Sequence, residues 1–115
     1  MRHGNVNRKF RRERKVRNAL MKALALSLVV NGKIKTTGPK ASSLRPFVEK
    51  LVTQGMTDTV TTRRLLTSKI GGIGAKKLVT DISPKYKDRK GGYTRITKLP
   101  ARKSDGSAMS VIEFV

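Results

Sequence analysis

The chain has 115 residues, of which 27 are lysine or arginine and 7 are aspartate or glutamate, giving a formal net charge of +20. This length is sufficient for one domain with a modest core. The lack of cysteine excludes disulfides, thiolate catalysis and cysteine-based zinc sites, and no apolar run approaches the roughly 20 residues of a membrane-spanning helix. The excess charge favours a polyanionic partner, because phosphates would relieve the repulsion among the cations.

Residues 1–12 are predicted to form an extended basic arm, followed by a single α/β domain over residues 13–115. The arm shows no apolar periodicity, and eight of the first eighteen residues are cations. An arginine-rich start is also found in organellar transit peptides. The helical pattern directly behind it favours a structural arm instead.

A first helix is predicted over residues 13–31. Apolar and small side chains recur on one stripe, which comprises Val16, Leu20, Ala23, Leu24, Ser27 and Leu28. Asn31-Gly32 is a typical helix end, because glycine readily adopts the left-handed conformation that follows the last turn. The next five residues, KIKTT, are rich in β-branched side chains and predict a short strand over residues 33–37.

A second helix is predicted to begin with Thr37 or Gly38 as its N-cap and Pro39 in its first turn, and to end at Gly55. Pro46 lies inside this helix and predicts a kink, since proline lacks the backbone donor. The apolar stripe continues on both sides of it, through Leu44, Phe47, Val48, Leu51 and Val52. Leu24 in the first helix and Leu51 in the second are therefore expected to lie in the core.

Asp58 is predicted to cap a third helix that ends near Ile70 and weakly buries Val60, Leu65 and Leu66. Residues 71–74 are rich in glycine and predict a break before a short fourth helix over residues 75–82. A basic loop over residues 85–92 then leads to two strands, residues 93–99 and 108–115, joined by a polar connection.

These elements predict an α+β fold in two layers. Their order is helix, strand, three helices, two strands, and the three strands are expected to form a small mixed sheet. The helices would cover one face of this sheet.

The sequence contains little that could support catalysis or metal binding. His3 is the only histidine, the seven acidic residues are scattered, and neither G-x-S-x-G nor a complete phosphate-binding loop is present. We therefore expect no enzyme activity, catalytic residue, metal, cofactor or small-molecule substrate.

Aromatic residues make up 4% of the chain, with no tryptophan, so platforms for stacking unpaired bases are largely missing. Recognition of the backbone and shape of a folded RNA or a duplex is favoured. The segment Gly72-Ile73-Gly74, followed by Lys76 and Lys77, is similar to the hairpin of helix-hairpin-helix DNA-binding modules, although a plain loop is the simpler interpretation. A nucleoid-type or helix-hairpin-helix DNA-binding protein is the alternative function.

Several stretches, in order along nearly the whole chain, resemble the seventeenth protein of the bacterial large ribosomal subunit. They are MRHG, LALSLVVNGKIKTT, PKASSLRPFVEKLVT, TRRLLTSKI and DRKGGYTRITKLPARKSDGSAMSVIEFV. The resemblance implies a structural, non-catalytic protein of the cytoplasmic ribosome, with no membrane partner. It also implies binding to large-subunit ribosomal RNA near the peptide exit tunnel, beside neighbouring ribosomal proteins.

The predicted RNA-binding residues combine the charge of the arm with positions carried over from this family. They are Arg2, His3, Arg8, Lys9, Arg11, Arg12, Arg14, Lys15, Arg17, Asn18, Lys35, Thr36, Thr37, Lys40, Arg45, Arg63, Arg64, Arg89, Lys90, Tyr93, Thr94, Arg95, Arg102 and Lys103.

Overall fold

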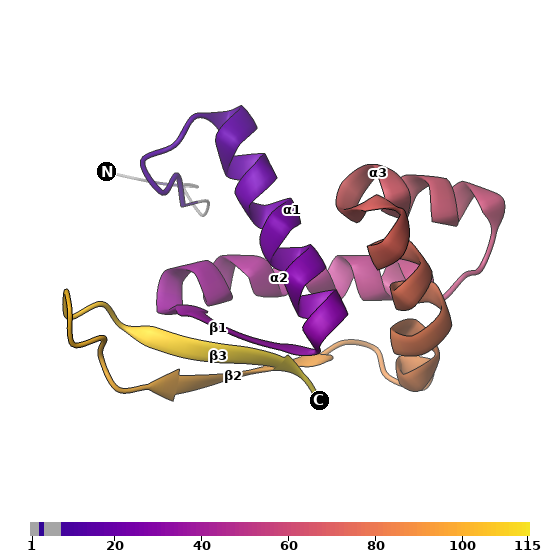
Figure 1. The fold of residues 1–115 in the computed structure, drawn as a ribbon. Helices are drawn as coiled ribbons and strands as arrows, with labels where there is room; N and C mark the ends of the chain where they lie inside the picture. The colour runs from indigo at the N-terminus through magenta and orange to yellow at the C-terminus, as the bar shows by residue number, and fades with distance from the viewer. Residues whose placement is uncertain (1–2, 4–7) are drawn as a thin grey trace.

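A computed structural model describes residue 3 and residues 8–115 and confirms the α+β class (Figure 1). The described elements are α1 (Arg14–Asn31), β1 (Lys33–Thr37), α2 (Gly38–Gly55), α3 (Val60–Lys77), the π-helical turn η1 (Leu78–Ile82), the 3-10 turn η2 (Ser83–Tyr86), β2 (Thr94–Leu99) and β3 (Met109–Phe114). Half of the predicted arm, residues 1–2 and 4–7, lies outside the described residues.

Helix α1 ends where the sequence predicts, with Gly32 in the left-handed conformation (φ 76°) and its N–H donating to the Leu28 carbonyl over 2.7 Å. Only its C-terminal half is anchored, through Ala25, Leu28 and Val29. The predicted stripe is wrong for Val16, which is 50% exposed, and for Ala23 and Ser27, which are also exposed. For Val16 the reason is visible in Figure 1, where the N-terminal half of α1 extends beyond the sheet. Ala23 and Ser27 lie in the anchored half, but the buried stripe there runs through Ala25, Leu28 and Val29, so these two residues fall outside it.

The three strands form a sheet in the order β1-β3-β2, and both strand pairs are antiparallel. The predicted mixed sheet is therefore wrong. Strands β1 and β2 run parallel to each other, but β3 lies between them, so β1 and β2 never pair directly. Glu113 of β3 lies opposite Lys33 of β1 on one side and Arg95 of β2 on the other.

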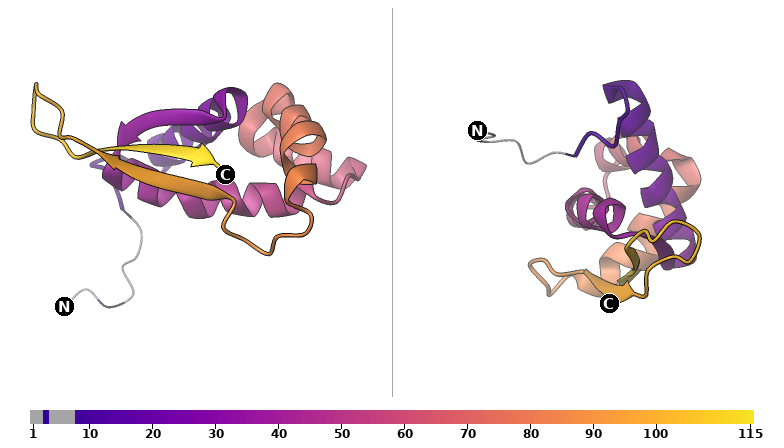
Figure 2. Two further views of the ribbon diagram at one scale, coloured as in Figure 1. Left: turned by 90° about the horizontal axis from the view of Figure 1, so that it is seen from below. Right: turned by 90° about the vertical axis from the view of Figure 1, so that its left-hand side faces the viewer.

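Helix α2 packs on one face of this sheet, and the other face is not covered by any described helix (Figures 1 and 2). Thr37 is its N-cap and Pro39 lies in its first turn, as predicted. The helix continues through Pro46 without being divided. Its buried stripe is Leu44, Val48, Leu51 and Val52, with Phe47 partly buried beside it.

Helix α3 departs from the prediction at its start. Thr59, and not Asp58, is the N-cap, because the Thr59 hydroxyl accepts from the Thr62 N–H over 3.1 Å. Val60 and Leu65 are 65% and 41% exposed, so only Leu66 of the three predicted contacts is buried.

The predicted break between two helices is confined to Gly71, whose φ of 85° and ψ of 167° interrupt the helical backbone. Helical backbone resumes directly after this residue and leads into η1. Gly74 lies in the contact with α1, and a Cβ built on it would be 2.8 Å from a methyl carbon of Leu26.

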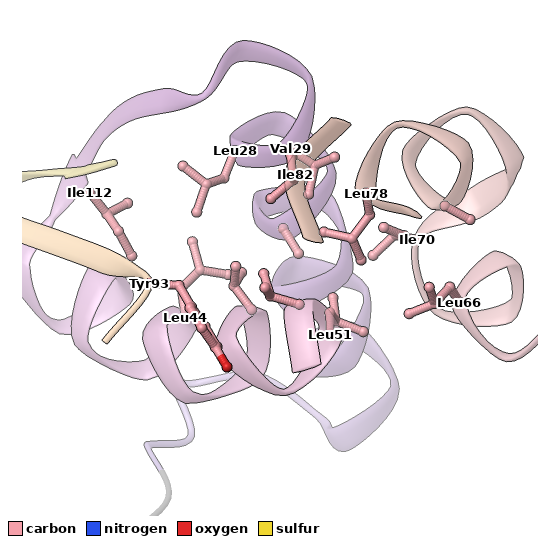
Figure 3. Packing of buried hydrophobic residues seen from close by; sticks show 14 of the residues in the cluster. Leu28, Val29, Leu44, Leu51, Leu66, Ile70, Leu78, Ile82, Tyr93 and Ile112 are labelled. Atoms are coloured by element: carbon pink, nitrogen blue, oxygen red, sulfur yellow. The ribbon is translucent and has the colours of Figure 1, made fainter. Parts of the chain in front are cut away.

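The core joins every layer of the molecule (Figure 3). Leu28 and Val29 of α1, Leu44 and Leu51 of α2, and Ile112 of β3 are all buried. The same cluster extends to Leu66, Ile70, Leu78 and Ile82 on the side of α3 and η1. Because each element contributes, the spacing between the surfaces described below is fixed by a single core.

Candidate nucleic-acid interface

Most cations have no carboxylate partner within the described residues. Four arginines approach a carboxylate oxygen at 2.6–3.9 Å, in the pairs Arg45–Glu49, Arg63–Asp58, Arg95–Glu113 and Arg102–Asp105. The surplus positive charge is therefore left for an external polyanion to neutralise.

Four of these cations surround a hollow that we call the basic groove, with a volume of about 650 Å³. Cations line it from both sides, with Arg8, Arg14 and Arg17 before and within α1, and Lys50 on α2. Among the residues that the structure describes, no acidic side chain lines it. The other lining residues are Phe10, Asn18, Met21, Ser42, Ser43, Pro46 and Phe47.

Residues 8–12 are held against the body by specific contacts. The Arg8 guanidinium donates to the Ser43 hydroxyl over 3.1 Å, and the Arg12 N–H donates to the Lys9 carbonyl over 3.0 Å to close a turn. The two central residues of this turn, Phe10 and Arg11, have positive φ angles of 51° and 53°. Such a conformation costs about 1–2 kcal/mol for each residue that has a Cβ, so this turn stores backbone strain.

A second hollow of about 500 Å³ continues along α2 toward the basic loop, which we define as residues 87–92. Pro46 and Lys50 line both hollows, whereas Gly91 and Tyr93 line only the second. The structure thus places the basic groove and the basic loop side by side along one helix, with Arg45 in the same region of α2.

The basic loop is anchored by side chains at its C-terminal end. The Glu49 carboxylate accepts from the Tyr93 N–H over 3.1 Å and from the Thr94 hydroxyl over 3.3 Å. Arg45 donates to the Thr94 carbonyl over 2.9 Å. The Tyr93 hydroxyl donates to the Arg89 carbonyl over 3.2 Å, so α2 determines where the loop is presented.

This arrangement buries two of the predicted binding residues. Tyr93 and Thr94 are each only 2% exposed, because their side chains complete the core and the network around Glu49. Their side chains are not accessible to an external ligand, whereas Arg89 and Lys90 are exposed on the loop.

Burial also explains a pKa shift next to the loop. Burial of the Tyr86 hydroxyl raises its pKa, an effect that the positive charge of Arg89 partly opposes. This hydroxyl donates to the Val115 carbonyl over 2.7 Å, so its role is structural.

Other predicted residues lie on the opposite face of the sheet. Lys35 and Arg95 occupy outer positions on the two edge strands, and a hollow of about 370 Å³ joins Lys35 to Arg102 and Lys103. Thr36 shares the inner face with Ile34 and is half-buried, and Thr37 caps α2. This outer surface is separated from the basic groove by the sheet and α2, so the predicted set is not one continuous site.

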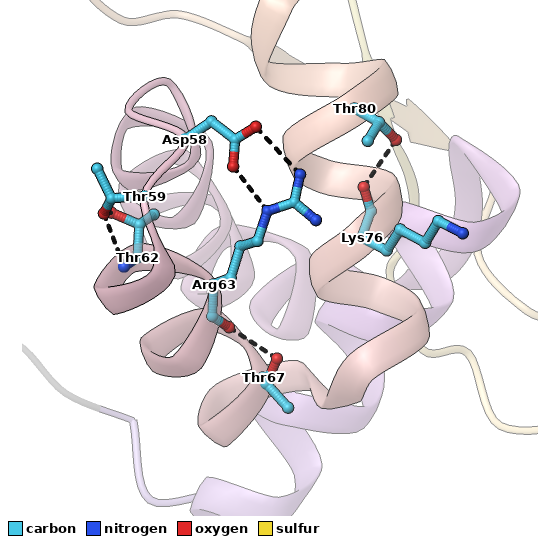
Figure 4. Close-up of polar contacts among 7 residues, drawn as sticks. All are labelled: Asp58, Thr59, Thr62, Arg63, Thr67, Lys76 and Thr80. Atoms are coloured by element: carbon cyan, nitrogen blue, oxygen red, sulfur yellow. Dashed lines mark hydrogen bonds and ion pairs between the residues drawn. The ribbon is translucent and has the colours of Figure 1, made fainter.

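Arg63 is on α3, where two of its three guanidinium nitrogens already have a partner (Figure 4). Its Nε and Nη2 atoms donate to the two oxygens of Asp58 over 2.6 and 3.0 Å. This hydrogen bonding lowers the pKa of Asp58 and raises the pKa of Arg63. Arg64 next to it is exposed, so it is the freer of the two to meet a phosphate.

Arg102 is engaged in a similar way in the loop between β2 and β3. It donates to Asp105 over 3.0 Å. The backbone N–H of Ser107 and the Arg102 side chain together lower the pKa of Asp105. To bind a phosphate, Arg63 and Arg102 would each have to share its hydrogen-bond donors with the carboxylate or give up that contact.

The hairpin of a helix-hairpin-helix module is not formed in the described part of the chain. Only Gly71 leaves the helical conformation, and Gly74 is buried between helices. Lys77 donates to the Val30 carbonyl over 2.6 Å, and thus binds the end of α1. Of these glycines, Gly74 serves helix packing, whereas Gly71 and Gly72 have open space around their Cβ positions.

The remaining predicted residues occupy the arm and the first turns of helices. His3, Lys9, Arg11, Arg12, Arg14, Lys15 and Asn18 are exposed, Arg17 and Lys40 are half-buried, and Arg2 lies outside the described residues. Within the described ranges, no cluster of His, Cys, Asp and Glu side chains could hold a metal ion. No described helix is long and apolar enough to cross a membrane.

Sequence reasoning missed seven of the eleven residues that line the basic groove. Ser43, Phe47 and Lys50 recur at helical spacing on α2, next to the buried stripe of Leu44, Val48 and Leu51. That spacing is a usable signal for a second, outward-facing stripe. No comparable sequence signal places Phe10 at the groove, because its position depends on the turn that the Arg12 N–H and the Lys9 carbonyl close.

Comparisons with known proteins agree on one family. A family model described as "Ribosomal protein L17" matches residues 20–115. A protein of Sulfurihydrogenibium sp. named "Large ribosomal subunit protein bL17" is 49% identical over 117 residues, covering 100% of this chain and 97% of that relative. Relatives with the same name are 43% identical in Nautilia profundicola, covering 100% and 98%, and 46% identical in Campylobacter jejuni, covering 100% and 99%.

Proposed function

Because the chain belongs to the ribosomal protein L17 family, we propose that it binds large-subunit ribosomal RNA through its arm, the basic groove and the basic loop. The protein is a structural, non-enzymatic constituent of the large subunit of the bacterial ribosome. By neutralising phosphates on RNA segments that would otherwise repel each other, it would stabilise the folded RNA.

The observation that supports this proposal best is the acid-free lining of the basic groove beside the exposed cations of the basic loop. A single core fixes the distance between the cations of the basic groove and those of the basic loop. This arrangement suits two RNA segments that must be held together. The rigid supports are α1, α2 and the network around Glu49.

A charge-removal experiment tests the proposal. Replacing Arg8, Arg11 and Arg12 with glutamine should weaken binding to bacterial large-subunit ribosomal RNA transcribed in vitro, because three phosphate-facing cations are removed. A matched variant carries Lys33→Gln, Lys69→Gln and Lys76→Gln on β1 and α3, outside residues 8–12, the basic groove and the basic loop. It loses the same charge and should retain most of the affinity.

Affinities are measured by filter binding at one fixed salt concentration, with circular dichroism to verify folding. Equal losses in the two variants would mean that only net charge matters, and the proposed interface would be wrong. A wild-type protein that binds a DNA duplex as tightly as the ribosomal RNA would favour the nucleoid-type alternative.

We also place the protein near the peptide exit tunnel, with neighbouring ribosomal proteins beside it, on the strength of the family resemblance. Since the chain has no cysteine, a single Val60→Cys variant provides one defined attachment point on an exposed site. Photo-cross-linking from this position in assembled subunits should capture ribosomal proteins of the tunnel exit. Capture only of proteins from the subunit interface would contradict this placement.

A further inference from the structure

The lining of the basic groove combines charged side chains with four apolar residues, which we call its apolar floor. Phe10 comes from the turn before α1, Met21 from α1, and Pro46 and Phe47 from α2. Arg8, Arg14 and Arg17 lie on one side and Lys50 on the other. A paired duplex offers phosphates and edges of base pairs but no free base face, so it would leave this floor unused.

An unpaired nucleotide matches both parts of the groove. Its base has a flat apolar face that can stack on an aromatic ring, and its phosphates suit the cations. The volume of about 650 Å³ falls within the range of about 300–1,000 Å³ that is typical of pockets for small organic ligands.

The strained turn gives independent support. Phe10 and Arg11 both have positive φ angles, at 51° and 53°, where residues with a Cβ are uncommon. The turn is held by the Arg12 guanidinium, which donates to the Phe10 carbonyl over 2.7 Å, and by the contact of Arg8 with Ser43. These contacts keep Phe10, which is half-buried, at the groove and not in free solution.

We propose that the basic groove binds a single RNA strand at an unpaired nucleotide, with the base stacked on Phe10 above Phe47 and the flanking phosphates bound by Arg8, Arg14, Arg17 and Lys50. This inference rests on the proposed RNA-binding function and makes it more specific. It also revises the expectation that stacking platforms are missing, since two phenylalanines at one site are sufficient for one base.

The test compares two RNA hairpins that are identical except for one bulged adenine. The wild-type protein should prefer the bulged hairpin. Phe10→Ala should reduce affinity for the bulged hairpin by about 5- to 100-fold, the range for losing one stacked base, and change affinity for the paired hairpin by less than about twofold. Phe10→Tyr should retain the preference. Because Phe10 precedes α1, these variants should leave the fold intact, as circular dichroism will verify.

A second measurement uses fluorescence, since the chain contains no tryptophan. In Phe10→Trp, binding of the bulged hairpin should quench the single tryptophan, whereas the paired hairpin should not. The control is Val60→Trp, at the exposed first residue of α3 and at the far end of the molecule from the arm (Figure 1). Its fluorescence should not respond differently to the two hairpins.

The possible failures can be distinguished. Equal affinity of the wild-type protein for both hairpins, unchanged by Phe10→Ala, would overturn this inference. The proposed function would still stand if the Arg8, Arg11 and Arg12 triple variant weakened binding to both. Failure of the wild-type protein to bind either hairpin or the ribosomal RNA would reject both.

Discussion

Glu49 shows how an acidic residue can contribute to a basic surface. Its carboxylate receives hydrogen bonds from the Tyr93 N–H and the Thr94 hydroxyl, and lies 3.8 Å from Arg45. These contacts attach the start of β2 to α2. A single negative charge thus positions the residues that follow the basic loop, at the cost of neutralising one arginine.

Leu51 and Leu24 were both expected to lie in the core, but they differ in burial. Leu51 is 1% exposed, whereas Leu24 is only partly buried. Leu51→Ala should lower the free energy of unfolding by about 2–5 kcal/mol, because it leaves a cavity, and Leu24→Ala should cost clearly less. Urea denaturation measures both. Leu65→Ala, at a side chain that is 41% exposed, is the control, and a cost similar to that of Leu51→Ala would contradict this core.

Asp58 should make stability depend on acid pH. Its hydrogen bonds with Arg63 lower its pKa below the ordinary 3.8, so their contribution is present above about pH 4 and is lost as the pH falls through the pKa of the folded state. Asp58→Asn should therefore be less stable than the wild type at pH 6, and the difference should narrow toward pH 3. Urea midpoints across this range measure it. A difference that stays constant with pH would show that this ion pair does not contribute.

At the scale of elements, the break in α3 depends on one residue. Gly71 has a φ of 85°, whereas the adjacent Gly72 is helical and has open space around its Cβ position. Gly71→Ala should therefore destabilise the protein by about 1 kcal/mol or more, and Gly72→Ala should stabilise it by about 0.4–1 kcal/mol. Thermal unfolding of the two variants provides a matched comparison. The same sign for both would mean that the break is not required.

Element boundaries were largely predictable, because their signals are local. Gly32 and Pro39 act through their own backbone preferences, and the structure places helix ends next to them. Helix α2 ends at Gly55 as predicted, but glycine suits this position for another reason, since a Cβ on Gly55 would lie 2.5 Å from the Ser83 hydroxyl oxygen. The strand arrangement was not predictable in the same way, since the pairing of Ile34 with Ile112 joins distant parts of the chain. The exposed half of α1 could not be recognised either, because an apolar pattern does not show whether a partner is present.

The candidate site was predictable in its chemistry but not in its shape. The cations of the arm and the basic loop follow directly from the composition. The basic groove forms only because residues 8–12 fold back toward α2, where Arg8 contacts Ser43. Tyr93 was misjudged because an aromatic residue beside Arg89 and Lys90 looks accessible in sequence, whereas the fold buries it.

For the whole molecule, the net charge of +20 should make salt act in opposite directions on folding and binding. Salt screens the repulsion within the free protein, so its melting temperature should rise with NaCl concentration. Affinity for ribosomal RNA should fall over the same range, with a log–log slope of about −0.7 to −0.9 for each phosphate neutralised. Scanning calorimetry and filter binding measure the two effects. An affinity that does not change with salt would exclude the electrostatic mechanism.

The central position of β3 has a consequence for how the chain reaches its native state. Strand β1 can pair only with β3, and the segment between them contains α2, α3 and β2. Such a pairing forms late, since a long loop must close first. Until then β1 is a short strand with two open edges, and Lys33 and Lys35 along it would repel an identical strand from another copy. Lys35, which is among the predicted RNA-binding residues, would thus also protect the nascent protein from self-association.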